Sequence, residues 1–164
     1  MQSHVTSCLE GAHVYLAGHT GLVGSALRRR LSKIPGIRLT VATRQELDLT
    51  QYPGVERFLS FHKPGLVILA AGRVGGIGAN AAFPAEFIQQ NLMIQTNLIH
   101  AAWKAGVQRL LNFGSGCMYP RECLQPMNTE LLMTGKLEPT SQSYALAKLA
   151  GMEMCAAYNR QHGT

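Results

Sequence analysis

The sequence lacks long apolar runs and dense charge. No apolar segment approaches the roughly 20 residues that span a bilayer, and residues 1–18 show no positive stretch followed by the apolar core of a secretion signal. Only 15% of the residues are Asp, Glu, Lys or Arg. We therefore expect a globular, cytoplasmic protein that has no membrane contact.

Cysteine is also scarce and scattered. The four cysteines form no Cys-x-x-Cys pair and do not stand with a histidine at the spacing of zinc ligands; they are Cys8, Cys117, Cys123 and Cys155. This pattern argues against a metal site and is typical of reduced thiols in the cytoplasm.

Basic residues outnumber acidic ones, 15 to 9, which gives a formal charge of +6. An excess of positive charge favours an anionic partner, such as a nucleotide, a nucleic acid or a membrane surface. The only basic run is at residues 28–30, and no basic stripe is interleaved with aromatic residues. We therefore expect no nucleic-acid partner.

Short apolar segments alternate along the chain with stretches of helical spacing. The segments without strict alternation predict strands that are buried on both faces, at residues 13–17, 39–43, 66–70 and 110–113. The helical patterns lie at residues 23–32, 53–62, 85–105 and 143–161. This order predicts an α/β fold with a doubly wound parallel sheet, of the Rossmann-like type that binds NAD(P). Ligands of such sheets bind in the loops that follow the strands.

The segment AGHTGLVG follows the first predicted strand and opens a helix. Its glycines are placed for a tight turn at Gly18, a close phosphate approach at Gly21 and helix packing at Gly24. An ordinary tight turn is the alternative, but the strand before and the helix after it favour a dinucleotide site. The Gly-x-x-Gly-x-x-Gly spacing resembles the short-chain dehydrogenase superfamily. The cradle also includes His19, Thr20, Leu22 and Val23.

The end of the second predicted strand carries Thr43 and Arg44 where an NAD enzyme usually has an acidic residue. An arginine there suits the 2′-phosphate of NADP, and a surface arginine beside Glu46 is the alternative. Asp48 and Leu49 resemble the superfamily's pair beside the adenine. The residues after the third strand complete the predicted cofactor site, namely Ala70, Ala71 and Gly72.

Tyr144 and Lys148 lie one turn apart on a predicted helix and therefore share a face. A free phenol has a pKa near 10, so a neighbouring ammonium that stabilises the phenolate makes tyrosine a usable acid or base. Lys148 can supply that charge and also hold the nicotinamide ribose. Ser115 follows the fourth predicted strand, where its hydroxyl can bond a substrate carbonyl. In isolation the Tyr-Lys pair is more typical of a solvated helix face, but Ser115 and the glycine loop favour the catalytic interpretation.

Cys117 lies two residues beyond Ser115. A thiol can remove a proton from a carbon beside a ketone if its surroundings lower its pKa. A buried structural cysteine is the alternative, and the residues by themselves favour that alternative.

Several longer segments resemble the GDP-L-fucose synthase family of extended short-chain dehydrogenases. They include AGHTGLVGSA, AAGRVGGIGAN, FGSGCMYP and LEPTSQSYALAKLAG. The resemblance implies NADPH as cofactor and 3,5-epimerisation with 4-reduction of GDP-4-keto-6-deoxy-D-mannose. It also implies that Tyr144 donates a proton at C4, Lys148 supports it, Ser115 binds the keto oxygen and Cys117 is the epimerisation base. A homodimer built on the two long helices is implied as well.

The chain departs from the family pattern at Thr20, where an arginine often holds the NADP phosphate. It also ends at Thr164, before the family's second epimerisation residue, a histidine, and its substrate domain. We therefore expect residues 1–164 to form the cofactor-binding domain and to be inactive alone. Another sugar-nucleotide epimerase or dehydratase, and a non-enzymatic module that binds NADPH or dimerises, remain the alternatives.

Overall fold

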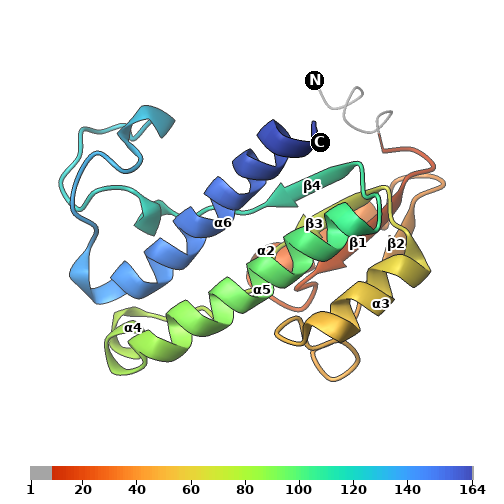
Figure 1. Cartoon of the computed structure of the whole chain (residues 1–164), viewed down its shortest axis with the longest axis horizontal. Helices are drawn as coiled ribbons and strands as arrows, with labels where there is room; N and C mark the ends of the chain where they lie inside the picture. The colour runs from red at the N-terminus through yellow and green to blue at the C-terminus, as the bar shows by residue number, and fades with distance from the viewer. Residues whose placement is uncertain (1–8, 164) are drawn as a thin grey trace.

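A parallel sheet of four strands forms the centre of the molecule (Figure 1). The structure is a computed structural model that describes residues 9–163, so Cys8 lies outside the described residues. The strands are β1 (His13–Ala17), β2 (Arg38–Thr40), β3 (Leu66–Leu69) and β4 (Arg109–Asn112), in the spatial order β2-β1-β3-β4. Every pairing is parallel, with Val14 opposite Leu66 and Leu66 opposite Arg109.

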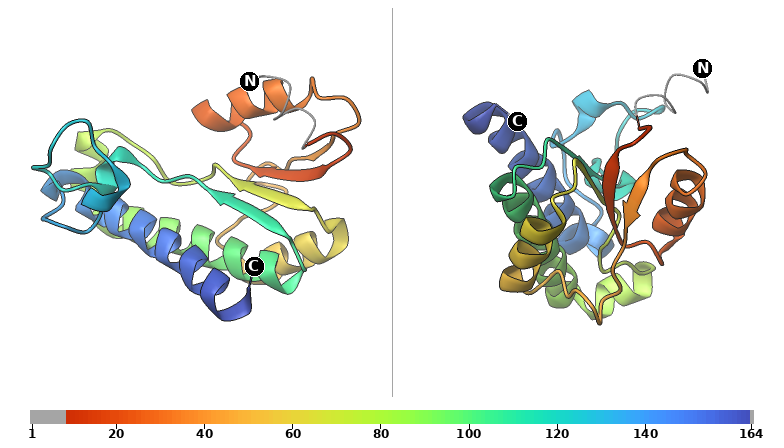
Figure 2. Two further views of the ribbon diagram at one scale, coloured as in Figure 1. Left: turned by 90° about the horizontal axis from the view of Figure 1, so that it is seen from above. Right: turned by 90° about the vertical axis from the view of Figure 1, so that its right-hand side faces the viewer.

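Helices cover both faces of this sheet, as Figure 2 shows. Helix α2 (Leu22–Leu31) lies on one face, and α3 (Tyr52–His62), α5 (Pro84–Lys104) and α6 (Gln142–His162) lie on the other. Strands and helices alternate because parallel neighbours require crossover connections. The predicted doubly wound α/β fold is confirmed.

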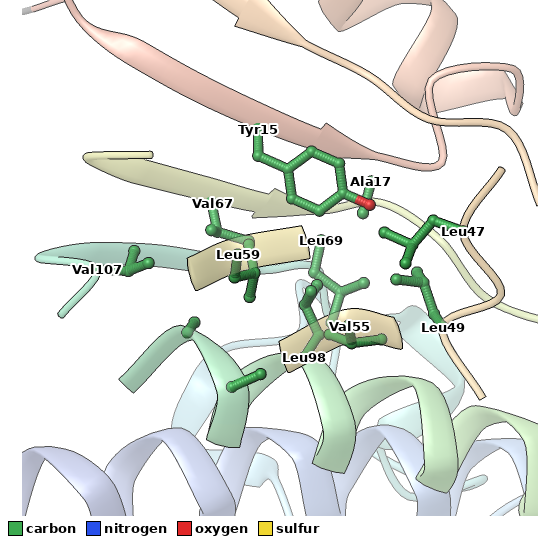
Figure 3. Close-up of a cluster of buried hydrophobic side chains, with 12 residues drawn as sticks. Tyr15, Ala17, Leu47, Leu49, Val55, Leu59, Val67, Leu69, Leu98 and Val107 are labelled. Atoms are coloured by element: carbon green, nitrogen blue, oxygen red, sulfur yellow. The ribbon is translucent and has the colours of Figure 1, made fainter. Parts of the chain in front are cut away.

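The two faces of β1 and of β3 belong to different clusters of the core. Tyr15, Val67 and Leu69 point toward α3 and α5, where they pack with Leu59 and Leu98 (Figure 3). The alternate positions of the same strands pack against α2 in a smaller cluster that includes Val14, Leu16, Ile68 and Leu31. Full burial of each such side chain contributes about 1.5–3 kcal/mol.

The second strand is shorter than predicted and ends at Thr40 rather than at residue 43. The backbone N–H and hydroxyl of Thr43 both donate to the carboxylate of Glu46, at 2.7 and 2.8 Å. This local turn competes with the strand ladder for the backbone of residue 43. The predicted strand therefore becomes a loop at the point where it reaches the cleft described below.

A short helix, α4 (Ile77–Ala82), was not predicted because its segment is rich in glycine, a poor helix former. The side-chain amide of Asn80 donates to the carbonyls of Gly75 and Gly76, at 2.9 and 3.1 Å. Local hydrogen bonds between a side chain and the backbone thus support a helix that residue propensity does not favour.

The loop between β4 and α6 holds short 3-10 helices at Gly116–Met118, Thr129–Leu131 and Pro139–Ser141. Within residues 9–163, no helix combines the length and the apolarity needed to cross a membrane. The same residues contain no group of three or more His, Cys, Asp or Glu side chains that could hold a metal ion.

Candidate active site

A cleft of about 590 Å³ lies at the carboxyl ends of β1, β2 and β3. This volume is in the range of sites for small molecules and cofactors. The loops that follow the three strands line the cleft, contributing residues 18–23, 42–44, 47–50 and 70–74. All the residues predicted to hold the cofactor line it except Gly24 and Lys148.

The three glycines of the first loop meet different surroundings. Gly18 has a φ of +85°, and a Cβ there would lie 2.6 Å from the backbone nitrogen of Ala71. A Cβ on Gly24 would overlap the carbonyl of Gly18, whereas a Cβ on Gly21 would meet only that carbonyl, at 3.5 Å. Gly18 and Gly24 are therefore required by the fold, and Gly21 leaves space that the protein itself does not use.

The first turn of α2 faces the same cleft through Leu22 and Val23. Gly21 is the N-cap residue, and no side chain of the described residues caps this helix end. Amide groups at a helix N-terminus carry a partial positive charge and bind anions such as phosphate. No acidic residue stands in this turn to compete with such an anion.

Arg44 forms the opposite wall of the cleft, with 73% of its side chain exposed. Its guanidinium lies 3.9 Å from the carboxylate of Asp48, whereas Glu46 is bound by Thr43. The alternative of an arginine held by Glu46 is therefore not the arrangement found. Hydrogen bonds from Thr50 to the other carboxylate oxygen, helped by the charge of Arg44, hold the pKa of Asp48 below its usual value. At 3.9 Å and largely exposed, Arg44 is only loosely paired with Asp48.

The third wall is the loop after β3, held in place by the buried side chain of Asn91. Its amide accepts from the backbone N–H of Arg73 and donates to the carbonyl of the same residue, both at 3.0 Å. The Arg73 guanidinium lies over the rings of Phe87 and Phe83, 5.2 and 5.8 Å from their centres. We did not predict Arg73 as a site residue, although a cation directly after a buried strand was the available signal.

Tyr144 lies beside Ser115, as predicted from the sequence. The phenol makes a hydrogen bond with the serine side chain, which lowers the pKa of Tyr144, but burial outweighs this effect and the pKa is raised overall. The effect of Lys148 on the pKa of this phenol stays a prediction. At neutral pH the phenol is therefore protonated and is a proton donor.

Lys148 is buried on the inner side of α6, with a relative exposure of 6%. Burial lowers its pKa, and the nearby Cys155 acts in the opposite direction. Lys148 shares its helix with Tyr144 but does not line the cleft.

Cys117 is half-buried in the short 3-10 helix that follows β4. Its backbone N–H donates to the hydroxyl of Ser115 at 3.3 Å. Cys117 also lies close enough to Tyr144 to raise the pKa of that phenol. The structure therefore brings Ser115, Cys117 and Tyr144 together.

The ring of Phe87 joins this group to the cleft. It meets the ring of Tyr144 edge to face, at 6.5 Å between centres, while the guanidinium of Arg73 lies over it. A ligand in the cleft that reaches Arg73 thus approaches the catalytic candidates.

A glycine-rich loop at the head of a parallel sheet defines the dinucleotide-binding class of α/β domains. The sequence profile of the NAD dependent epimerase/dehydratase family matches residues 14–164. The chain belongs to this family.

The chain is also similar to individual family members. It is 51% identical over 154 residues to GDP-L-fucose synthase 1 of Arabidopsis thaliana, covering 94% of this chain and 48% of that protein. It is 48% identical over 155 residues to GDP-L-fucose synthase of Sinorhizobium fredii, covering 94% of this chain and 49% of that protein. The chain therefore spans about half the length of these relatives.

A solved structure shows the same fold. The GDP-mannoheptose C4 reductase of Campylobacter jejuni with NADP bound superposes with a TM-score of 0.89 at 44% identity, over 93% of this chain and 48% of that one.

Proposed function

We propose that this chain is the NADP(H)-binding portion of an enzyme that epimerises C3 and C5 of GDP-4-keto-6-deoxy-D-mannose and reduces C4. The observation that carries the proposal is the contact chain from the cleft through Phe87 to Tyr144 and Ser115. About 50% identity to GDP-L-fucose synthases supports the substrate.

The cleft fits a dinucleotide with an extra phosphate. Open space at Gly21 and the uncapped start of α2 suit the pyrophosphate. Arg44, whose charge is only loosely paired, suits the 2′-phosphate. When bound, NADPH supplies the hydride for C4.

The residues beside the cleft supply the proton chemistry. Ser115 donates a hydrogen bond to the C4 oxygen, and the protonated phenol of Tyr144 gives that oxygen its proton as the carbonyl becomes an alcohol. A raised pKa keeps the phenol protonated at neutral pH, which suits reduction. A role of Lys148 in holding the ribose stays a prediction, because its side chain is buried and does not line the cleft.

Cys117 has the role of the base that removes a proton from the carbons beside the ketone. Its thiol lies beside Ser115 and Tyr144, which places it near the same carbonyl. Inversion also needs an acid that returns a proton from the opposite face. We propose that residues 1–164 are the cofactor domain of the enzyme and do not complete the reaction alone.

The test has two stages. Fluorescence titration of the chain with NADPH and with NADH measures binding, and we expect tighter binding of NADPH. NADPH absorbance is then followed with GDP-4-keto-6-deoxy-D-mannose, for this chain and for the chain fused to the second half of the Sinorhizobium fredii relative. Consumption by the fusion alone supports the proposal. An inactive fusion that still binds NADPH refutes the substrate, and failure to bind refutes the cofactor.

We also propose that two copies pair through α5 and α6, in the cytoplasm. The two helices pack along their lengths, and the thiols of Cys117 and Cys123 are free, which suits a reducing compartment. Sedimentation equilibrium tests the pairing, and a monomer at all concentrations refutes it.

A further inference from the structure

A buried glutamine, Gln95, connects three elements that meet behind the catalytic candidates. Its side-chain nitrogen donates to the carbonyl of Asn91 on α5 at 3.0 Å and to that of Ala147 on α6 at 2.8 Å. Its side-chain oxygen accepts from the amide of Asn112 on β4 at 3.3 Å. The side chain is 2% exposed.

The two ends of this connection lie close in sequence to the catalytic candidates. Ala147 directly precedes Lys148 and is in the same helical turn as Tyr144. Asn112 is the last residue of β4, and the chain then runs to Ser115. Gln95 therefore sets the spacing between the strand that delivers Ser115 and the helix that delivers Tyr144.

Gly151 makes room for this side chain. A Cβ at residue 151 would overlap the side-chain oxygen of Gln95 and would lie 2.9 Å from the amide nitrogen of Asn112. Because the glycine has no side chain, the carboxamide of Gln95 can reach the backbone of α6. The close packing of Gln95 against α6 therefore depends on the absence of a side chain at Gly151.

A buried amide costs free energy unless its hydrogen bonds are made, and an apolar side chain would pack two helices equally well. What the amide adds is a fixed distance and direction for three partners at once. We infer that Gln95 is a positioning residue, which acts through the α6 backbone and Asn112 to hold the Tyr144 phenol against Ser115. The inference rests on the proposed function only for the catalytic roles of these two residues.

The test measures the ionisation of Tyr144 in the 164-residue chain, without cofactor or substrate. Ultraviolet absorbance is followed through alkaline pH, and the curve of the matching Tyr144→Phe chain is subtracted, with circular dichroism recorded at each pH to verify folding. Gln95→Met retains the side-chain volume but removes all three hydrogen bonds. We expect its Tyr144 titration to move to higher pH, because the Ser115 hydrogen bond that lowers this pKa is lost.

Two control variants show how large a shift in the Tyr144 titration to expect. Ser115→Ala removes the hydrogen bond to the Tyr144 phenol directly and should give the full upward shift of its pKa. Asn97→Ala removes a comparable connection, from the Asn97 amide on α5 to the carbonyl of Leu49 at 2.9 Å. We expect this control to lower the midpoint of thermal unfolding and to leave the Tyr144 titration unchanged.

If Gln95→Met does not fold, Asn112→Ala replaces it, since it removes only the β4 end of the connection, and the expected shift is smaller in the same direction. A Tyr144 titration that stays in place or moves to lower pH, in whichever variant folds, overturns the inference. Neither result affects the cofactor assignment, and failure of NADPH to bind leaves the titration test intact.

Discussion

The carbonyl oxygen of Gly18 lies so close to the α-carbon of Gly24 that a Cβ on Gly24 would overlap it. This contact packs the turn after β1 against the first turn of α2. Gly21, between them, has no comparable neighbour. Glycines of one motif therefore meet two different requirements, protein packing at Gly24 and ligand approach at Gly21.

Alanine at these two positions should separate the requirements. We expect Gly24→Ala to lower the free energy of unfolding by about 1–3 kcal/mol or more, because the new methyl group has no space. Gly21→Ala should change it by no more than about 0.5 kcal/mol and should weaken NADPH binding strongly. Urea unfolding and fluorescence titration measure the two effects. Equal loss of stability in both variants would contradict this division.

Arg44→Ala should weaken binding of NADPH by about tenfold to a hundredfold, in line with the loss of a charge-assisted hydrogen bond. Binding of NADH should be nearly unchanged, because NADH has no 2′-phosphate. Titration of each cofactor by fluorescence gives the two affinities. Arg57→Ala is the matched control, since Arg57 is exposed on α3 away from the cleft. An equal loss for both cofactors would assign Arg44 another role.

The sequence predicted the parts of this structure that depend on local pattern. The apolar segments at β1 and β3 lack alternation because helices cover both faces of the sheet. The glycine loop was found because its spacing and its place between a strand and a helix were both visible. Tyr144 and Ser115 were paired through their resemblance to the superfamily triad, and the structure places them in contact.

Features that depend on tertiary surroundings were missed or misjudged. The pKa of Tyr144 is governed by burial, which no local spacing reveals. Asn91 and Gln95 stand in a helix of ordinary pattern, and nothing nearby shows that they are buried or which carbonyls they bind. Helix α4 forms where residue propensity opposes it, because the side chain of Asn80 bonds the carbonyls of the two residues that precede the helix.

Asp48 should make the fold sensitive to acid. Its pKa is lowered from 3.8 by hydrogen bonds from the backbone and hydroxyl of Thr50. A carboxyl with a lowered folded-state pKa contributes stability above its unfolded-state pKa and loses it as the pH falls through the folded-state value. The free energy of unfolding should therefore fall as the pH drops from about 5 to about 2.

The Asp48→Asn variant tests this contribution. We expect it to be less stable than the original chain at neutral pH and to lose less stability in acid, because one titrating group has been removed. Glu46, whose pKa is lowered by Thr43, adds a change of the same sign in both chains. Urea unfolding at several pH values gives the two slopes, and identical slopes would show that Asp48 does not contribute.

Asn91 should control the loop that forms the third wall of the cleft. Its side chain makes three hydrogen bonds, two to the backbone of Arg73 and one to the carbonyl of Phe87 at 2.7 Å. At about 1 kcal/mol for each, Asn91→Ala should lower the free energy of unfolding by about 3 kcal/mol. The amide hydrogen of Arg73 should also exchange with solvent much faster, because its acceptor is lost.

The Asn97→Ala variant is the control. It loses a single hydrogen bond, so it should lower the free energy of unfolding by about 1 kcal/mol and leave the Arg73 amide protected. If the Arg73 amide stayed protected in Asn91→Ala, the packing of the Arg73 guanidinium on Phe87 and Phe83 would be what holds the loop.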